Sequence, residues 1–168
     1  MMSGDMVTCR QCGEQHTVDS LELTFFRPDA VVELSEVERA RDADESDDLC
    51  VISGGRFFIR ATLPIPVLES ETPYRIGVWV EAEEADFRRV YELWNDEHQV
   101  NEPPFSVTLA NTIPTVQDTR GLGAELRLTG PTTRPEVFII CSGHPLAGQQ
   151  RHGVTPHRAY EYTASVQK

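Results

Sequence analysis

The chain has 168 residues and a formal net charge of −12 at pH 7. One hydrophobic core can bury roughly two-thirds of the unfolded surface at this length, so we expect a single domain over residues 1–168. The apolar and charged contents are average, which excludes a disordered or fibrous chain. No run approaches the roughly twenty apolar residues that cross a bilayer, and no secretion signal is visible. We therefore expect a cytoplasmic protein without membrane association.

The acidic charge narrows the classes of partner. It repels nucleic-acid phosphates, and no stripe of Lys and Arg between aromatic residues offsets it, so we expect no nucleic-acid partner. A basic protein partner is compatible, because an acidic surface speeds encounter with it. Acidity that only aids solubility is the alternative.

Residues 1–20 contain the sequence Cys9-Arg10-Gln11-Cys12, which is typical of a metal knuckle. Two thiolates at this spacing supply two corners of a tetrahedral zinc site. Without a secretion signal, cytosolic reductants favour thiols or metal ligands over disulfides. Reduced thiols without a metal are one alternative, and a redox dithiol is another, although no aromatic residue precedes Cys9 and no βαβ pattern surrounds it.

Residues 35–48 form a predominantly acidic segment that we expect to be exposed. Its first half has helix-forming residues and predicts a short surface helix. Its second half, Asp42-Ala43-Asp44-Glu45-Ser46-Asp47-Asp48, is a run of like charges that repel one another and predicts a solvated loop.

The middle of the chain predicts strands followed by a helix. Residues 49–52 and 56–63 are rich in β-branched and aromatic residues, and Ser53-Gly54-Gly55 between them predicts a hairpin turn. Residues 74–81 predict another strand, and the aromatic spacing over 83–94 predicts a helix. These elements should bury one common set of side chains, namely Phe57, Ile59, Val78, Phe87, Tyr91 and Trp94.

Later segments predict strands over 105–110, 124–128 and 136–141 and helices over 144–151 and 156–165. Thr155 should cap the last helix, with Pro156 in its first turn. Strands and helices do not alternate regularly, so the predicted class is α+β, with a mainly antiparallel sheet, a few packed helices and the N-terminal metal-knuckle segment.

Read in order, short motifs across nearly the whole chain resemble the bacterial family of unknown function DUF2199. They are Cys9-x-x-Cys12-Gly13-x-x-His16, Asp48-Leu49-Cys50-Val51-Ile52, Phe57-Phe58-Ile59-Arg60, Ile65-Pro66-Val67, Gly77-Val78-Trp79-Val80, Phe87 to Leu93-Trp94, Pro104-Phe105, Asn111-Thr112-Ile113-Pro114, Asp118-Thr119, and His144-Pro145-Leu146-Ala147 with Gln150. The resemblance implies no established activity. It does imply His16 and Cys50 as the further ligands of a zinc bound by Cys9 and Cys12. A rival pair is Cys141 with His144.

Two functional classes remain open. The first is a noncatalytic protein-interaction module with a structural zinc-type site, whose acidic surface meets a basic protein partner. The alternative is a hydrolase or transferase with a site near His144, Asp118 and Trp79, joined by Arg60 or Arg120. No phosphate-binding loop, nucleophile elbow or dinucleotide fingerprint is present, which favours the module.

Overall fold

The computed structural model describes residues 6–8, 15–17 and 22–165, and for the first two ranges only the backbone. The elements in chain order are β1 (Met6–Thr8), β2 (Gln15–Thr17), α1 (Asp29–Val32), α2 (Glu36–Asp42), β3 (Ala43–Glu45), β4 (Leu49–Ile52), β5 (Arg56–Ile65), β6 (Tyr74–Ala82), α3 (Glu84–Glu92), the 3-10 helix η1 (Glu97–Asn101), β7 (Phe105–Leu109), β8 (Gly123–Arg127), β9 (Glu136–Ile139), α4 (Pro145–His152) and α5 (Pro156–Ala164). The predicted α+β class is confirmed.

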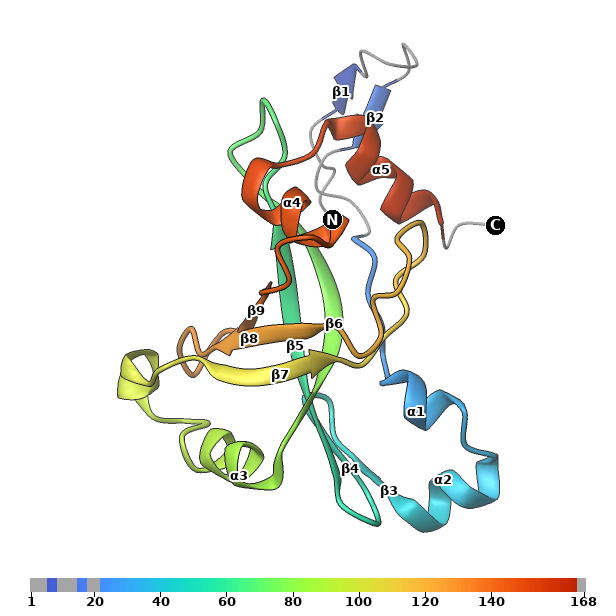
Figure 1. Ribbon diagram of the computed structural model, residues 1–168, viewed down its shortest axis with the longest axis vertical. Coiled ribbons are helices and arrows are strands. Elements are labelled where there is room, and N and C mark those ends of the chain that lie inside the picture. Colours follow the sequence, from blue (N-terminus) through green and yellow to red (C-terminus); the bar gives the residue numbers. More distant parts are fainter. Residues whose placement is uncertain (1–5, 9–14, 18–21, 166–168) are drawn as a thin grey trace.

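The main sheet has the strand order β3-β4-β5-β6-β7-β8-β9. Every neighbouring pair in that order is antiparallel. A parallel contact between Thr62 in β5 and Glu136 in β9 closes strands β5 to β9 into a small barrel and makes the sheet mixed. In Figure 1 the long β5–β6 hairpin runs through the molecule and β7 to β9 cross it, with α4 and α5 at one end and α2 and α3 at the other.

The hairpin between β4 and β5 forms as the sequence predicts. Gly54 and Gly55 adopt φ angles of 104° and 100°, the left-handed region that disfavours side chains. The strand alternation of β6 also follows the prediction: Ile76, Val78 and Val80 enter the main core, which fills the barrel. At Gly77 a Cβ atom would come within 2.9 Å of Thr24, so the glycine lets the chain before α1 run beside β6 and pair with it in parallel.

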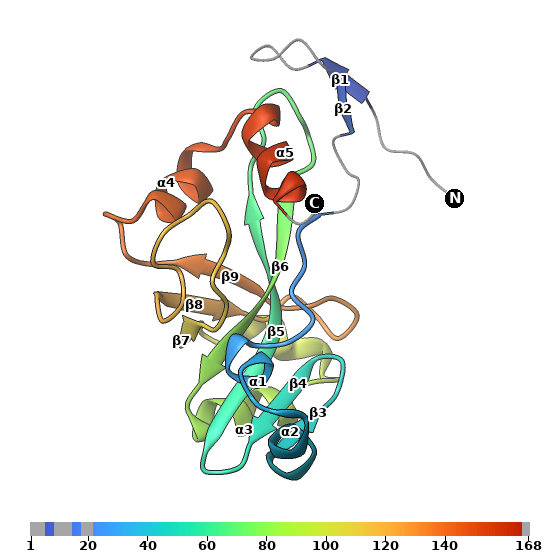
Figure 2. The same cartoon turned by 90° about the vertical axis from the view of Figure 1, so that its right-hand side faces the viewer.

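A second, smaller apolar cluster lies on the outer face of β4 to β6. Its buried members are Ala30, Val31, Cys50, Ile52, Phe58, Trp79 and Ala110. The short helix α1 supplies Ala30 and Val31 and covers the strands, as the side view in Figure 2 shows. This layer holds the candidate site described below.

The acidic segment differs in part from its prediction. Its first half forms α2, which begins with a capping box in which the Ser35 hydroxyl accepts from the Glu38 N–H and the Glu38 carboxylate accepts from the Ser35 N–H. In its second half the loop prediction is right only for residues 46–48, because residues Ala43–Glu45 pair with β4 as an edge strand. Backbone pairing and the ion pairs of Glu45 with Arg27 and Arg39 offset the like-charge repulsion.

Two further predictions concern helices. Thr155 caps α5 by accepting from the Arg158 N–H, with Pro156 at the first position, as expected. Helix α3 is shorter than predicted, and Tyr91 is not a core residue because 59% of it is exposed. Only a narrow stripe of this two-turn helix faces the barrel, through Val90 and the half-buried Phe87, and Tyr91 points past it.

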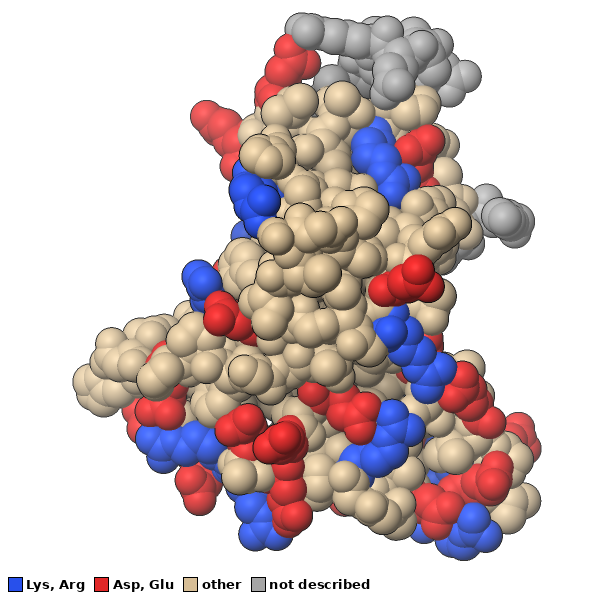
Figure 3. All heavy atoms as spheres, viewed as in Figure 1, with Lys and Arg blue, Asp and Glu red and all other residues tan. Residues whose placement is uncertain are grey.

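Charged side chains are unevenly distributed over the surface. Figure 3 shows acidic and basic side chains interspersed around α2 and α3, whereas the middle of the same face is largely uncharged. In the part of the chain that the structure describes, no helix has both the length and the hydropathy needed to cross a bilayer.

Candidate functional site

The candidate site lies on the outer faces of β5 and β6. Alternation places Arg56, Phe58 and Arg60 on the outer face of β5, and Trp79 and Glu81 on that of β6. The register pairs Phe58 with Glu81, so Arg56 lies diagonally across from the carboxylate and can reach it. Nε and Nη2 of Arg56 donate to the two Glu81 oxygens over 2.9 and 2.8 Å. This two-point geometry fixes both side chains.

A buried asparagine attaches α1 to these strands. The Asn111 side-chain oxygen accepts from the Trp79 N–H at 2.7 Å, and its amide nitrogen donates to the Arg27 carbonyl and the Asp29 carboxylate, both at 3.0 Å. The second Asp29 oxygen accepts from the Thr112 N–H at 2.7 Å. Asn111 is fully buried, so every polar atom of its amide needs these partners.

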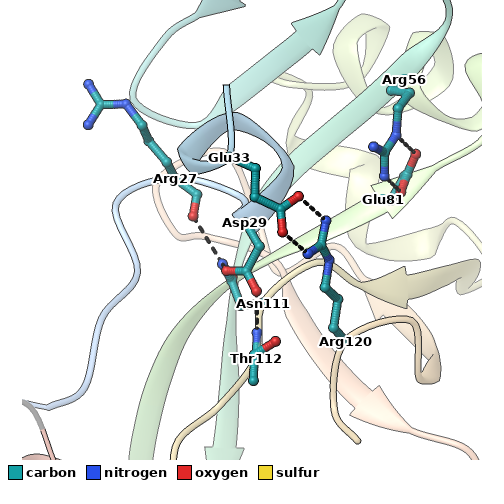
Figure 4. Close-up of polar contacts among 8 residues, drawn as sticks. All are labelled: Arg27, Asp29, Glu33, Arg56, Glu81, Asn111, Thr112 and Arg120. Carbon is teal, nitrogen blue, oxygen red and sulfur yellow. Dashed lines mark hydrogen bonds and ion pairs between the residues drawn. The ribbon is translucent and has the colours of Figure 1, made fainter. Parts of the chain in front are cut away.

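A second two-point ion pair lies at the other end of α1. Glu33 follows the helix and accepts from Nη1 and Nη2 of Arg120 at 2.6 and 3.0 Å. The Arg120 guanidinium lowers the pKa of Glu33, and the Glu33 carboxylate raises the pKa of Arg120. Figure 4 shows this pair and the Arg56–Glu81 pair flanking one region, with Asn111 and Asp29 beside it.

The two ion pairs border a pocket of about 100 Å³. Its apolar lining comes from Ala30, Phe58, Leu109 and Ala110, and its polar lining from Arg56, Glu81, Thr108, Arg120 and the backbone of Gly121. The Glu81 carboxylate raises the pKa of Arg56, as Glu33 does for Arg120, so both guanidinium groups stay charged throughout the physiological range. These shifts equip the pocket for ion pairing and hydrogen bonding, and not for a proton transfer by these groups.

Arg60 forms a neighbouring buried centre. Only 8% of it is exposed, and its guanidinium lies 5.8 Å from the Trp79 ring and 5.6 Å from the ring of the exposed Phe26. Nη1 donates to the Asp47 carbonyl, whereas the buried Nε has no hydrogen-bond partner among the described residues. Burial lowers the pKa of Arg60, and the two aromatic faces compensate part of the lost hydration.

The structure describes the side chain of only one of the four sequence-predicted metal ligands, Cys50. Cys9 and Cys12 lie outside the described residues and stay a prediction, as does the side chain of His16, whose backbone belongs to β2. Cys50 is 1% exposed within the apolar cluster under α1, at the opposite end of the molecule from β2 (Figure 1). Burial raises the pKa of its thiol to about 11, which opposes the thiolate that a zinc ion binds.

The rival pair occupies a turn before α4. Cys141 is exposed, and its carbonyl accepts from the His144 N–H. His144 caps α4: Nδ1 accepts from the Leu146 N–H at 3.1 Å, so Nε2 carries the proton and donates to the Gln117 carbonyl at 2.8 Å. Both ring nitrogens are therefore engaged. Among the residues with described side chains, no group of three or more His, Cys, Asp and Glu is arranged to hold a metal ion.

The alternative catalytic set is not gathered into one site. Asp118 is exposed and adopts a φ of 55° in the loop that accepts the His144 hydrogen bond. Trp79 lies elsewhere, buried beneath α1, where its indole N–H donates to the Phe25 carbonyl. Of the two arginines considered with it, Arg60 contacts the Trp79 ring and Arg120 lines the pocket beside α1.

Sequence reasoning missed the pairing that defines the pocket. Strand alternation together with the β4–β5 turn could have placed Arg56 on the outer face, but its contact with Glu81 depends on the register of β5 against β6. Glu33 and Arg120 are 87 residues apart, and no local signal connects them.

Comparison with known proteins gives the family. The model of DUF2199, described as an uncharacterised protein conserved in bacteria, matches residues 8–154. The chain therefore belongs to this bacterial family, whose function is unknown. No curated protein matches it, and no solved structure does.

Proposed function

We propose that the protein is a noncatalytic interaction module whose acidic face binds a basic protein partner. The acidic face comprises α2, β3 and the turn that leads into β4. The carrying observation is that Glu36, Asp44 and Asp47 on this face are exposed and make no ion pair with any described residue. These carboxylates are therefore available to form ion pairs with the Lys and Arg side chains of a basic partner.

The other acidic side chains of the segment have partners within the chain. Asp42 pairs with Arg41, Glu45 with Arg27, and Asp48 with Arg134. The Glu45–Arg27 and Asp48–Arg134 pairs join the edge of the sheet to other segments of the chain. The three uncompensated ones should therefore contribute to association, whereas the paired ones should contribute to the local structure.

Exposed apolar side chains next to these acids support the proposal. Val37 in α2 is 73% exposed and Val32 in α1 is 68% exposed. Interfaces combine a charged rim that guides encounter with apolar contacts that slow dissociation. The proposed partner therefore presents basic residues around an apolar contact, in the cytoplasm that the sequence predicts.

The test compares two triple variants with equal change in net charge. The first carries Glu36→Gln, Asp44→Asn and Asp47→Asn. The control carries Glu71→Gln, Glu83→Gln and Glu97→Gln, which are exposed outside the acidic face. Immobilised wild-type protein should retain a basic protein from a bacterial lysate at low salt and release it as salt rises.

The first variant should lose that protein and the control should keep it, and with the purified partner the loss should fall mainly on the association rate. Equal retention by both triple variants would contradict the proposal. So would a catalytic turnover that His144→Ala abolishes and the first variant leaves intact.

We also propose that Cys9 and Cys12 bind a structural zinc ion. The support is their spacing in the sequence, and the family resemblance adds His16 and Cys50 as further ligands; Cys50, buried under α1 far from β2, would have to be reached by a rearrangement. Native mass spectrometry should show about one zinc per chain, lost in the Cys9→Ser, Cys12→Ser variant. A metal-free wild-type protein with the same melting temperature as this variant would refute the site.

A further inference from the structure

Charged side chains of both signs gather at the pocket beside α1. Arg56, Glu81 and Arg120 line the pocket, and Glu33 neutralises Arg120 from just outside the lining. Each pair also affects the pKa values of the other. The Glu81 carboxylate raises the pKa of Arg56, and the Arg120 charge opposes part of that rise. The Glu33 carboxylate raises the pKa of Arg120, and the Glu81 charge adds to that rise. The four groups sum to zero, so neither a bare anion nor a bare cation is favoured.

Hydrogen-bonding capacity remains at the pocket after the ion pairs form. Arg56 uses Nε and Nη2 for Glu81, which leaves Nη1, and Arg120 uses both Nη atoms for Glu33, which leaves Nε. The half-buried Thr108 hydroxyl makes no hydrogen bond to a described residue. Carboxylate oxygens accept more than one hydrogen bond, so Glu81, which lines the pocket, can also accept from a ligand.

The size and floor of the pocket limit the ligand. The volume of about 100 Å³ is well above the roughly 10–15 Å³ that one water needs, and it suits a ligand of a few heavy atoms. Phe58, Leu109 and Ala110 form an apolar floor suited to a methyl-sized group. Gly121, at a φ of 86°, lines the pocket without a side chain.

From this geometry we propose that the pocket binds a small zwitterion, namely an α-amino acid with a compact side chain. The ligand carboxylate lies between Nη1 of Arg56 and Nε of Arg120. Its ammonium group donates to a Glu81 oxygen or to the Thr108 hydroxyl, and its side chain contacts the apolar floor. This site is independent of the acidic face.

The experiment is a titration of the full ¹⁵N-labelled chain followed by NMR. L-alanine is the main probe, acetate and methylammonium each carry one of its two charges, and L-phenylalanine tests size. Alanine should shift the amide signals of Thr108, Ala110 and Gly121 at roughly millimolar concentration, and each of the other probes should bind about tenfold more weakly.

Two variants and one control complete the test. Arg120→Gln should weaken alanine binding by about tenfold, as expected when one charge-assisted contact is lost. Thr108→Val keeps both ion pairs and should weaken alanine binding several-fold. This variant tests the site without the risk that α1 detaches, which Arg120→Gln carries because it removes the Glu33 pair. Arg88→Gln, which breaks a surface pair with Glu84 on α3, should bind alanine like the wild type.

The proposal is overturned if alanine leaves these signals unchanged at roughly 10 mM, about tenfold above the dissociation constant it requires. It is also overturned if acetate or methylammonium binds as tightly as alanine, which would identify a site for a single charge. Equal weakening by Arg88→Gln and Arg120→Gln would attribute the effect to net charge and overturn it as well.

Discussion

Replacing Asn111 by Ala should destabilise the protein more than any exposed substitution. Its amide makes three hydrogen bonds, to the Trp79 N–H, the Arg27 carbonyl and the Asp29 carboxylate. Alanine leaves the buried Trp79 N–H without an acceptor and removes two donors from the segment that carries α1. The fold would keep its barrel but lose the attachment of the layer that covers its outer face.

The magnitude follows from these contacts. An unsatisfied buried N–H costs about 1–3 kcal/mol, and each of the other two bonds contributes about 0.5–1.5 kcal/mol, the one to the carboxylate at the upper end. The expected loss is therefore about 3–6 kcal/mol in the free energy of unfolding. For a chain of this size each kcal/mol lowers the melting temperature by roughly 2–4 °C.

The assay is urea unfolding followed by tryptophan fluorescence, because Trp79 lies in this layer. Asn95→Ala, at an exposed position, is the matched control and should change the stability by less than about 0.5 kcal/mol. Asn111→Asp keeps the shape but places a second carboxylate against Asp29, so it should be at least as destabilising as alanine. A loss below about 1 kcal/mol for Asn111→Ala would refute the role assigned to this side chain.

Three further outcomes are expected. First, burial raises the pKa of the Cys50 thiol to about 11, so the folded state keeps a proton that the unfolded thiol loses near pH 9. The resulting contribution to stability is complete below about pH 9 and is lost as the pH rises to about 11. Cys50→Ala should flatten this decline in urea unfolding, and an unchanged slope would contradict it. Second, iodoacetamide followed by peptide mapping should label the exposed Cys141 far faster than Cys50 in the folded protein, and equal rates would show that the cluster opens readily. Third, Tyr91→Ala should cost less than about 1 kcal/mol and Val90→Ala about 2–3 kcal/mol; the reverse order would place Tyr91 in the core.

The local elements were largely determined by the sequence. Gly54 and Gly55 predict the hairpin because few other residues adopt a positive φ, and Thr155 with Pro156 predicts the start of α5 because both act on the adjacent backbone. The alternation of apolar residues over 74–81 separates the core face of β6 from its outer face, because successive side chains of a strand point to opposite sides. In each case the deciding interactions join residues close in the chain.

Tertiary structure alone decided which outer-face residues meet. Tyr91 repeats with the apolar spacing of α3, yet the barrel covers only part of that helix, and Asp44 belongs to a strand because β4 offers it backbone partners. The pocket arises because β5 and β6 pair in one register and because Asn111 holds α1 against them, which brings Glu33 to Arg120. Contacts over such separations depend on how the whole chain packs, so the spacing of residues along the sequence does not encode them.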